Sequence, residues 1–365
     1  MDVVYVKSKK RVDSKEKIDL ILKEVLFILI LIVFLGIITL LVLSVFGEKK
    51  LYEKMPTCGD GTFYDSCSLT KPYFCGQGTL VEKSSRCGCP SGFFKEGDYC
   101  SNVLQTGVVD LNLQYTLKGV SDSISFSVYG GINDYVKSLP RSLYSSNNES
   151  YSRYEFKRIK LDDELQRISI EPLVVRIQNL APNSKVDQAR IAISLVQNIP
   201  YSESKEILTI GNLSISNVSR FPYQVLFEES GACEGKSELL ALLLDEIGYE
   251  TSLLYYQDEN HESVGIKCPW EHSLRGSGYC FVETTSPSII TDDSGTYLGA
   301  GQLFSIPEIV IISKGISLPE GLDEYGDSLD YARIRSKGVV NFFTKGKWER
   351  LNSKYGLDNI VYFIE

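Results

Sequence analysis

The chain contains little histidine and little clustered positive charge. Only two of its 365 residues are histidines, and no stretch beyond residue 24 concentrates Lys and Arg. The formal net charge is −9 at pH 7. Because phosphate groups are bound by clustered basic side chains, this composition argues against a nucleic-acid partner. With 43% hydrophobic residues, the chain is nevertheless able to bury a sizeable core.

The sequence has a single long run of uncharged residues. It spans residues 25–47, VLFILILIVFLGIITLLVLSVFG, and holds 23 residues without a charge. A helix of that length measures about 34 Å at about 1.5 Å per residue, enough to cross a bilayer core of about 30 Å. The run is longer than the apolar region of a cleaved signal peptide, and no small-residue cleavage site is evident. We therefore predict a single-pass transmembrane helix over residues 25–47.

The charges beside this run predict its orientation. The basic residues on its N-terminal side outnumber those close by on the other side; they are Lys7, Lys9, Lys10, Arg11, Lys15, Lys17 and Lys23, against Lys49, Lys50 and Lys54. Since basic flanks stay inside, we expect residues 1–24 to be a cytoplasmic tail and the C-terminal part to lie outside the cell membrane. Glycosylation sequons at Asn148, Asn212 and Asn217 agree with this exposure, although such tripeptides also occur by chance.

Cysteine is concentrated in one short segment. Six of the nine cysteines fall within 43 residues: Cys58, Cys67, Cys75, Cys87, Cys89 and Cys100. The segment has no Cys-x-x-Cys pair and no histidine, which disfavours a zinc site. We predict a small module over residues 48–101 that three disulfides stabilise in place of a large core, with fifteen connectivities open.

The other three cysteines are Cys233, Cys268 and Cys280. Cys268 and Cys280 flank a loop between two strand-like runs, so a disulfide between them is expected. That pairing leaves Cys233 alone at the start of an apolar helical run, GACEGKSELLALLLDEIGYE. An odd cysteine in an exported domain is either an intermolecular linker or a free reactive thiol.

Three further segments follow the cysteine-rich module. Residues 102–160 contain two alternating apolar and polar runs, predicted to form a hairpin turned near residues 119–123, and then a short helix. Residues 161–318 contain helical runs, one of them expected at least beyond Pro172, followed by strand-like runs. This order indicates an α+β fold rather than a doubly wound parallel sheet. Residues 319–365 form a C-terminal extension in which we identify no chemistry.

The position of Cys233 suits a nucleophile. The unpaired N–H groups at a helix N-terminus favour a thiolate and are able to bind an oxyanion. His261 opens a predicted strand, whereas His272 lies in the loop between Cys268 and Cys280, a poor place for a positioned base. A hairpin turned near residue 272 places Glu283 opposite His261 on one face, where it is able to orient the imidazole.

Three segments, taken in order, resemble the transglutaminase-like superfamily. They are SGACEGKSELLALLLDEIGYETSLLYY, ENHESVGIKC and GYCFVETTSP, preceded by ARIAISLVQNIPYSE, and the resemblance covers roughly residues 174–287. It implies a papain-like α+β core in which a central Cys-bearing helix packs on an antiparallel sheet. It also implies that Cys233 is the nucleophile, His261 the base and then the acid, and Glu283 the orienting carboxylate, with no cofactor and no metal.

Two positions depart from the family pattern. Most members have Asp where this sequence has Glu283, and an aromatic residue often stands beside the histidine where Glu262 follows here. The second oxyanion donor is not evident from the motif, and Gln197 and Gln224 are the candidates.

These residues predict acyl transfer from a peptide or protein substrate through a Cys233 thioester. Water then gives a peptidase or amidase, whereas a lysine amine gives a cross-linker; hydrolysis is favoured because no shielded acceptor site is evident. Two alternatives remain. The same fold serves a non-catalytic surface protein for binding or adhesion, or Cys233 forms an intermolecular disulfide.

Overall fold

The computed structural model describes residues 14–47, 56–140, 153–204, 207–210, 213–216, 218–338 and 340–357. The chain divides into two compact units, Met1–Met55 and Pro56–Glu365. The sequons at Asn148, Asn212 and Asn217 lie outside the described residues.

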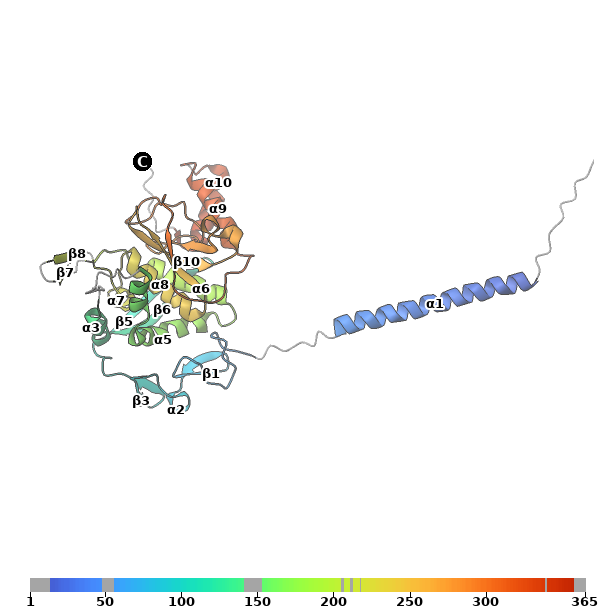
Figure 1. Ribbon diagram of the computed structural model, residues 1–365, viewed down its shortest axis with the longest axis horizontal. Helices are drawn as coiled ribbons and strands as arrows, with labels where there is room; N and C mark the ends of the chain where they lie inside the picture. The colour runs from blue at the N-terminus through green and yellow to red at the C-terminus, as the bar shows by residue number, and fades with distance from the viewer. Residues whose placement is uncertain are drawn as a thin grey trace, which may run out of the picture. The chain divides into compact units, whose positions relative to one another are not determined.

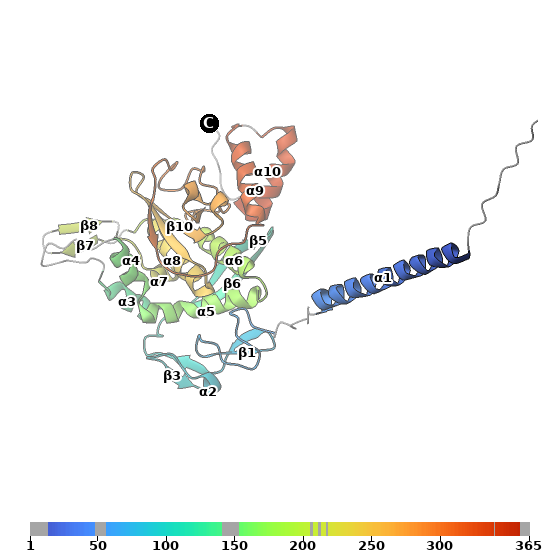
Figure 2. The ribbon, with the colours of Figure 1, turned by 45° about the vertical axis from the view of Figure 1, so that its right-hand side comes forward.

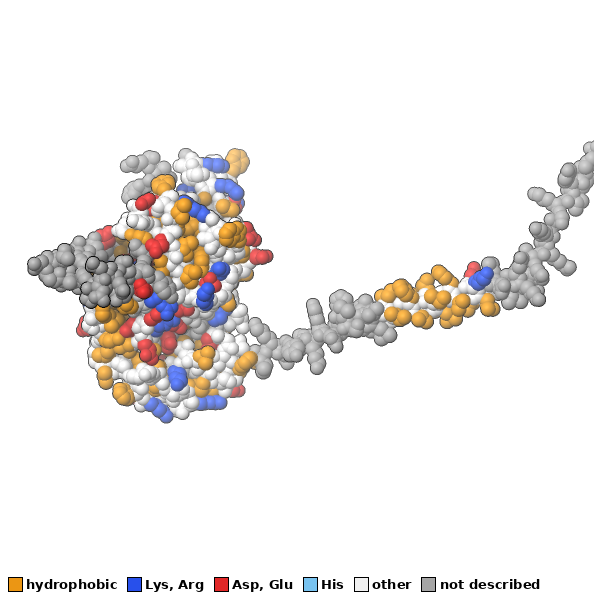
Figure 3. All heavy atoms as spheres, in the orientation of Figure 1, with side chains coloured by type: hydrophobic (Ala, Val, Ile, Leu, Met, Phe, Trp, Pro, Cys, Tyr) orange, Lys and Arg blue, Asp and Glu red, His pale blue; other side chains and the backbone are white. Residues whose placement is uncertain are grey.

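The first unit contains helix α1 (Ser14–Gly47). Within it, the stretch Leu22–Thr39 is long and apolar enough to cross a membrane, and none of its side chains is buried within the protein. Figure 3 shows this stretch as a band of hydrophobic side chains with charged ones at one end. Exposure of so continuous an apolar surface to water is unfavourable, whereas a lipid bilayer would cover it, which agrees with a membrane helix.

The second unit begins with the disulfide module. Its disulfides are Cys58–Cys75, Cys67–Cys87 and Cys89–Cys100, which confirms the predicted role of all six cysteines. Its elements are short: β1 (Tyr73–Gly76), β2 (Thr79–Glu82), α2 (Ser84–Cys87), β3 (Phe94–Glu96) and β4 (Tyr99–Ser101). The module packs on helix α5 (Glu164–Leu180), where the Asn179 side chain exchanges two hydrogen bonds with the Leu80 backbone, 2.8 and 3.0 Å long. Figures 1 and 2 show α5 between this module and the rest of the unit.

The predicted hairpin is present as β5 (Val108–Leu117) and β6 (Val120–Tyr129). Its turn is Lys118–Gly119, two residues with positive φ, so it is tighter than the turn expected near residues 119–123. Helix α3 (Gly130–Ser138) follows directly. The apolar face of the hairpin packs on α6 (Lys185–Asn198) and joins the main core.

The remaining elements are helical segments and one small ribbon. They are α4 (Arg153–Leu161), β7 (Ile207–Ile210), β8 (Leu213–Ser216), α7 (Pro222–Phe227), α8 (Cys233–Ile247), the 3₁₀ turns η1 (Trp270–His272) and η2 (Leu274–Gly276), α9 (Asp323–Arg335) and α10 (Phe342–Tyr355). Helix α5 runs through Pro172 instead of beginning after it, because the Asp163 side chain caps its start at Gln166 N–H and its apolar face is buried on both sides of the proline.

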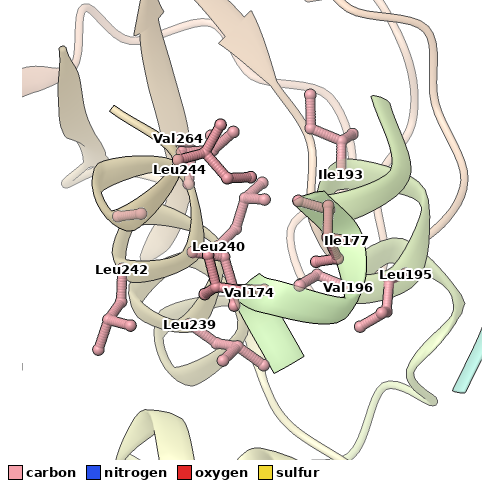
Figure 4. Packing of buried hydrophobic residues seen from close by; sticks show 14 of the residues in the cluster. Val174, Ile177, Ile193, Leu195, Val196, Leu239, Leu240, Leu242, Leu244 and Val264 are labelled. Carbon is pink, nitrogen blue, oxygen red and sulfur yellow. The ribbon is translucent and has the colours of Figure 1, made fainter. Parts of the chain in front are cut away.

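The centre of the unit is helix α8 against an antiparallel sheet. The strands are β9 (Thr251–Tyr256), β10 (His261–Lys267), β11 (Tyr279–Val282) and β12 (Glu308–Ile311), in the spatial order β11-β10-β9-β12. The run Leu239–Leu244 of α8 is fully buried between this sheet and helices α5 and α6 (Figure 4). Gly248 ends α8 in the left-handed conformation, with φ 106°. The predicted α+β class is confirmed, and the predicted Cys268–Cys280 disulfide joins the far ends of β10 and β11.

Gly265 lies in the middle of β10, where the neighbouring strands leave no room for a larger side chain. A Cβ at this position would overlap Ser252 Oγ, and it would lie 3.1 Å from Tyr279 Cβ and 3.2 Å from Leu254 Cδ2. We expect Gly265→Ala to lower the free energy of unfolding by about 1–3 kcal/mol, as overpacking of a core does. Urea denaturation followed by circular dichroism measures the change.

Gly346 in α10 provides the matched control, because no atom beyond its own turn of helix lies within 4 Å of its added Cβ. Gly346→Ala removes backbone entropy from the unfolded chain, so we expect it to stabilise the protein by about 0.5–1 kcal/mol. Equal effects of the two substitutions would contradict the tight packing around Gly265.

Candidate active site

Cys233 is the first residue of α8, so the helix begins at the sulfur-bearing residue itself. Eight of the nine cysteines are paired in disulfides, which leaves its thiol free. The side chain is partly exposed and lines an open cavity of about 220 Å³ together with Tyr201, Asn260 and His261. A free thiol at a helix N-terminus, open to a cavity, has the accessibility that a nucleophile needs.

His261 is the first residue of β10 and is 1% exposed. Its Nε2 lies 3.0 Å from Glu283 Oε2, and Cys233, which lines the same cavity, is near enough to help raise the pKa of the imidazole. Because Nε2 is committed to the carboxylate, Nδ1 is the ring nitrogen left for the sulfur. The ring stacks on Tyr297, with 6.2 Å between the ring centroids and 9° between the ring planes, which holds its orientation.

The surroundings of His261 favour its charged form. Burial lowers the pKa of this imidazole, but the hydrogen bonds with Cys233 and Glu283 and the charges of both groups outweigh it and raise the pKa to about 10. For Glu283 the same balance acts in reverse: burial raises the pKa of the carboxyl, and the contacts with His261 and Thr285 bring it below its usual value. The two form a buried imidazolium–carboxylate pair at neutral pH.

Glu283 follows β11 directly and is fully buried. The Thr285 N–H and hydroxyl donate to Glu283 Oε1 over 2.8 and 2.6 Å, so both carboxylate oxygens have partners. The register of β10 and β11 pairs Val264 with Val282, which makes His261 and Glu283 diagonal neighbours on one face. The expected proximity of His261 and Glu283 on one face is thus confirmed, while the register differs by two residues from direct opposition, since the connecting loop contains two 3₁₀ turns.

The structure places the other predicted residues elsewhere. Gln197 Nε2 donates to the backbone carbonyls of Glu283 and Ser288, at 2.9 and 3.1 Å, so this amide supports the Glu283 loop and does not line the cavity. Gln224 is fully buried in α7, where its Oε1 accepts the Phe221 N–H, and it does not line the cavity either. His272 lies in η1, stacked on Tyr325 with 3.8 Å between the ring centroids.

Tyr201 is a cavity residue that the sequence did not single out. It forms a parallel bridge with Gly231, two residues before Cys233, and its hydroxyl lies 3.5 Å from Glu203 Oε1. Burial raises the pKa of Tyr201 to about 12, and the nearby Cys233 and Glu203 contribute to the rise. The sequence signal that could have identified Tyr201 is its position in the IPYSE turn. A neutral hydroxyl that lines the same cavity as Cys233 is able to donate to an oxyanion, whereas Gln197 and Gln224 do not line that cavity.

The charge of His261 makes stability depend on pH. Its pKa is about 10 in the folded protein and about 6.5 in an unfolded chain, so its charged form contributes fully below pH 6.5 and the contribution is lost as the pH rises through 10. We expect the free energy of unfolding of the wild type minus that of His261→Gln to fall across this window. Urea denaturation at about pH 6, 8 and 10 measures it, and a difference that stays constant would contradict the buried pair.

The site thus brings a thiol, an imidazole and a carboxylate together from three elements that are separate in the chain. Comparison of the sequence and the structure with family models, curated proteins and solved structures found no match. What these three groups do together is therefore inferred from their own geometry and chemistry.

Proposed function

We propose that this protein is a membrane-anchored thiol acyl transferase with a transglutaminase-like core, which hydrolyses peptide or other amide bonds outside the cell. One observation carries the proposal: a free thiol, Cys233, shares an open cavity with His261, whose other side is hydrogen bonded to a fully buried carboxylate, Glu283. A nucleophile, a base within reach and a third group that orients the base are the parts of covalent acyl-transfer catalysis.

The first half-reaction forms a thioester. The Cys233 sulfur bonds to the substrate carbonyl carbon, and the carbonyl electrons move to the oxygen, near the first N–H groups of α8 and the Tyr201 hydroxyl. The His261 imidazolium then gives its proton to the amine nitrogen as the C–N bond breaks, so the amine leaves neutral. Glu283 stabilises the imidazolium throughout and keeps Nδ1 turned toward the sulfur.

The second half-reaction regenerates the thiol. Water enters the cavity, and neutral His261 takes one of its protons as the oxygen bonds to the thioester carbon. The C–S bond then breaks, which releases the acid and returns the thiolate–imidazolium pair. An amine in place of water gives a cross-link through the same intermediate. The open cavity gives water direct access to Cys233, which supports hydrolysis.

The location is part of the same proposal. Disulfides persist in oxidising compartments, and eight of the cysteines here are paired. With residues 25–47 as the membrane span and the basic residues before residue 25 in the cytoplasm, the second unit lies outside the cell. Its substrate is then an extracellular peptide or protein.

Two substitutions test the chemistry. We expect Cys233→Ala to abolish cleavage, because no acyl-enzyme forms, and His261→Ala to lower kcat/KM by about 10²–10⁴-fold, because proton transfer is lost. The full chain in detergent is incubated with a peptide library, with and without an amine acceptor, and the products are read by mass spectrometry. Products that carry the amine would assign cross-linking instead of hydrolysis.

His272→Ala is the matched control, since it removes the chain's other histidine, which lies away from the cavity. It should keep both cleavage and the rapid alkylation of Cys233 by iodoacetamide near neutral pH. Equally slow alkylation in the wild type and in His261→Ala would contradict the proposal and favour a binding protein.

A further inference from the structure

A buried ionic cluster lies directly behind the Cys233–His261 pair. Two lysines of α4, Lys157 and Lys160, one turn apart, face Glu234 and Glu238 of α8 and Glu262 of β10. Glu234 follows Cys233 in the chain, and Glu262 follows His261. Four of the five side chains are at most 2% exposed, the exception being Glu234 at 35%.

Lys157 is the centre of this cluster. Its Nζ lies 2.5 Å from Glu234 Oε1, 2.7 Å from Glu238 Oε1 and 3.0 Å from Glu262 Oε2. An ammonium has three donors, so all of them are used by carboxylates. The three acceptors come from two elements, so a single nitrogen joins the helix that carries the nucleophile to the strand that carries the base.

Lys160 completes the support from the same face of α4. Its Nζ lies 2.5 Å from Glu238 Oε2 and donates to Ser219 Oγ over 2.9 Å. The cluster holds three carboxyl groups against two ammonium groups. Burial and the two neighbouring glutamates raise the pKa of Glu262 to about 7 although Lys157 lowers it, so the acids repel one another and depend on both lysines to stay close together.

We propose that Lys157 is a positioning residue that sets the separation of the Cys233 sulfur and the His261 imidazole, by holding Glu234 and Glu262 on one ammonium group. The inference rests on the proposed function. A second contact runs parallel to it, since Ser237 Oγ donates to the Glu262 backbone carbonyl over 2.9 Å. The helix and the strand are thus joined both through a backbone atom and through side chains, at residues that follow the reacting pair in the chain.

A role in overall stability alone does not explain this cluster. Burying ions costs desolvation energy, and apolar side chains of similar volume often stabilise a core equally well. Three short charge-assisted hydrogen bonds fix the position of each carboxylate relative to the ammonium group. Apolar side chains have no such directional contacts, so they would not fix these positions. The neighbours of the nucleophile and the base are where such definition affects the rate, since small displacements of reacting groups are costly.

Three variants of the full chain in detergent test the proposal. Lys157→Met removes the ammonium, Glu262→Gln removes one arm and keeps its shape, and the double variant keeps the net charge of the cluster unchanged. We expect kcat to fall about ten- to a hundredfold in each, and to fall by more than KM changes, since the reacting groups are displaced; Glu234 and Glu262 also line the cavity, so KM is measured beside kcat. We also expect the rate of Cys233 alkylation by iodoacetamide to lose its wild-type dependence on pH.

The matched control is an ion pair away from the cavity with one buried partner, partly exposed Arg190 Nε with buried Glu324 Oε1 at 2.5 Å. Arg190→Met/Glu324→Gln should lower the thermal midpoint and leave the alkylation profile as in the wild type. A folded charge-balanced variant at Lys157 with wild-type kcat and a wild-type profile would overturn this inference alone. A wild type whose alkylation does not depend on His261 would overturn the proposed function and the inference with it.

Discussion

The bond between His261 and Glu283 is the interaction on which the rest of the site depends. Each group alone would lose its charge in so dry an environment, because burial opposes the charged form of both. Together they keep it, so that a charged imidazole lines the same cavity as the Cys233 side chain. Much of the surrounding structure serves this pair: Thr285 occupies the second carboxylate oxygen, Gln197 holds the backbone of Glu283, and Tyr297 stacks on the imidazole.

The parts of the site that could be predicted are those with local signals. Cys233 stands where an apolar helical run begins, and His261 opens a strand, so both were identified from neighbours a few residues away. The register of Glu283 was missed by two residues because the loop between the strands coils into two 3₁₀ turns, one with Arg275 at φ 48°, and such a loop defeats counting. Gln197 was wrongly expected to bind an oxyanion. Its amide donates instead to the backbone carbonyls of Glu283 and Ser288, and these lie about 90 residues away in sequence, where no local pattern reveals them.

The fold shows the same division. The apolar helix, the hairpin and the strands around α8 follow from composition and periodicity, and the module's six cysteines from their density. Lys157 could not be predicted, because a lysine in a polar helix is usually solvated and its carboxylate partners lie 77 to 105 residues further along the chain. Disulfide connectivity was likewise open, since it depends on which sulfurs the folded module brings together.

Complete pairing of the other eight cysteines leaves Cys233 without a resolving thiol. If an oxidant converts this sulfur to sulfenic acid, no second cysteine of the chain is free to condense with it and rescue it. Recovery then depends on a small thiol from the surroundings that reaches the cavity. A mild reductant restores such a sulfur, whereas a strong one opens the four cross-links as well, so the redox buffer decides whether the purified protein is intact and competent.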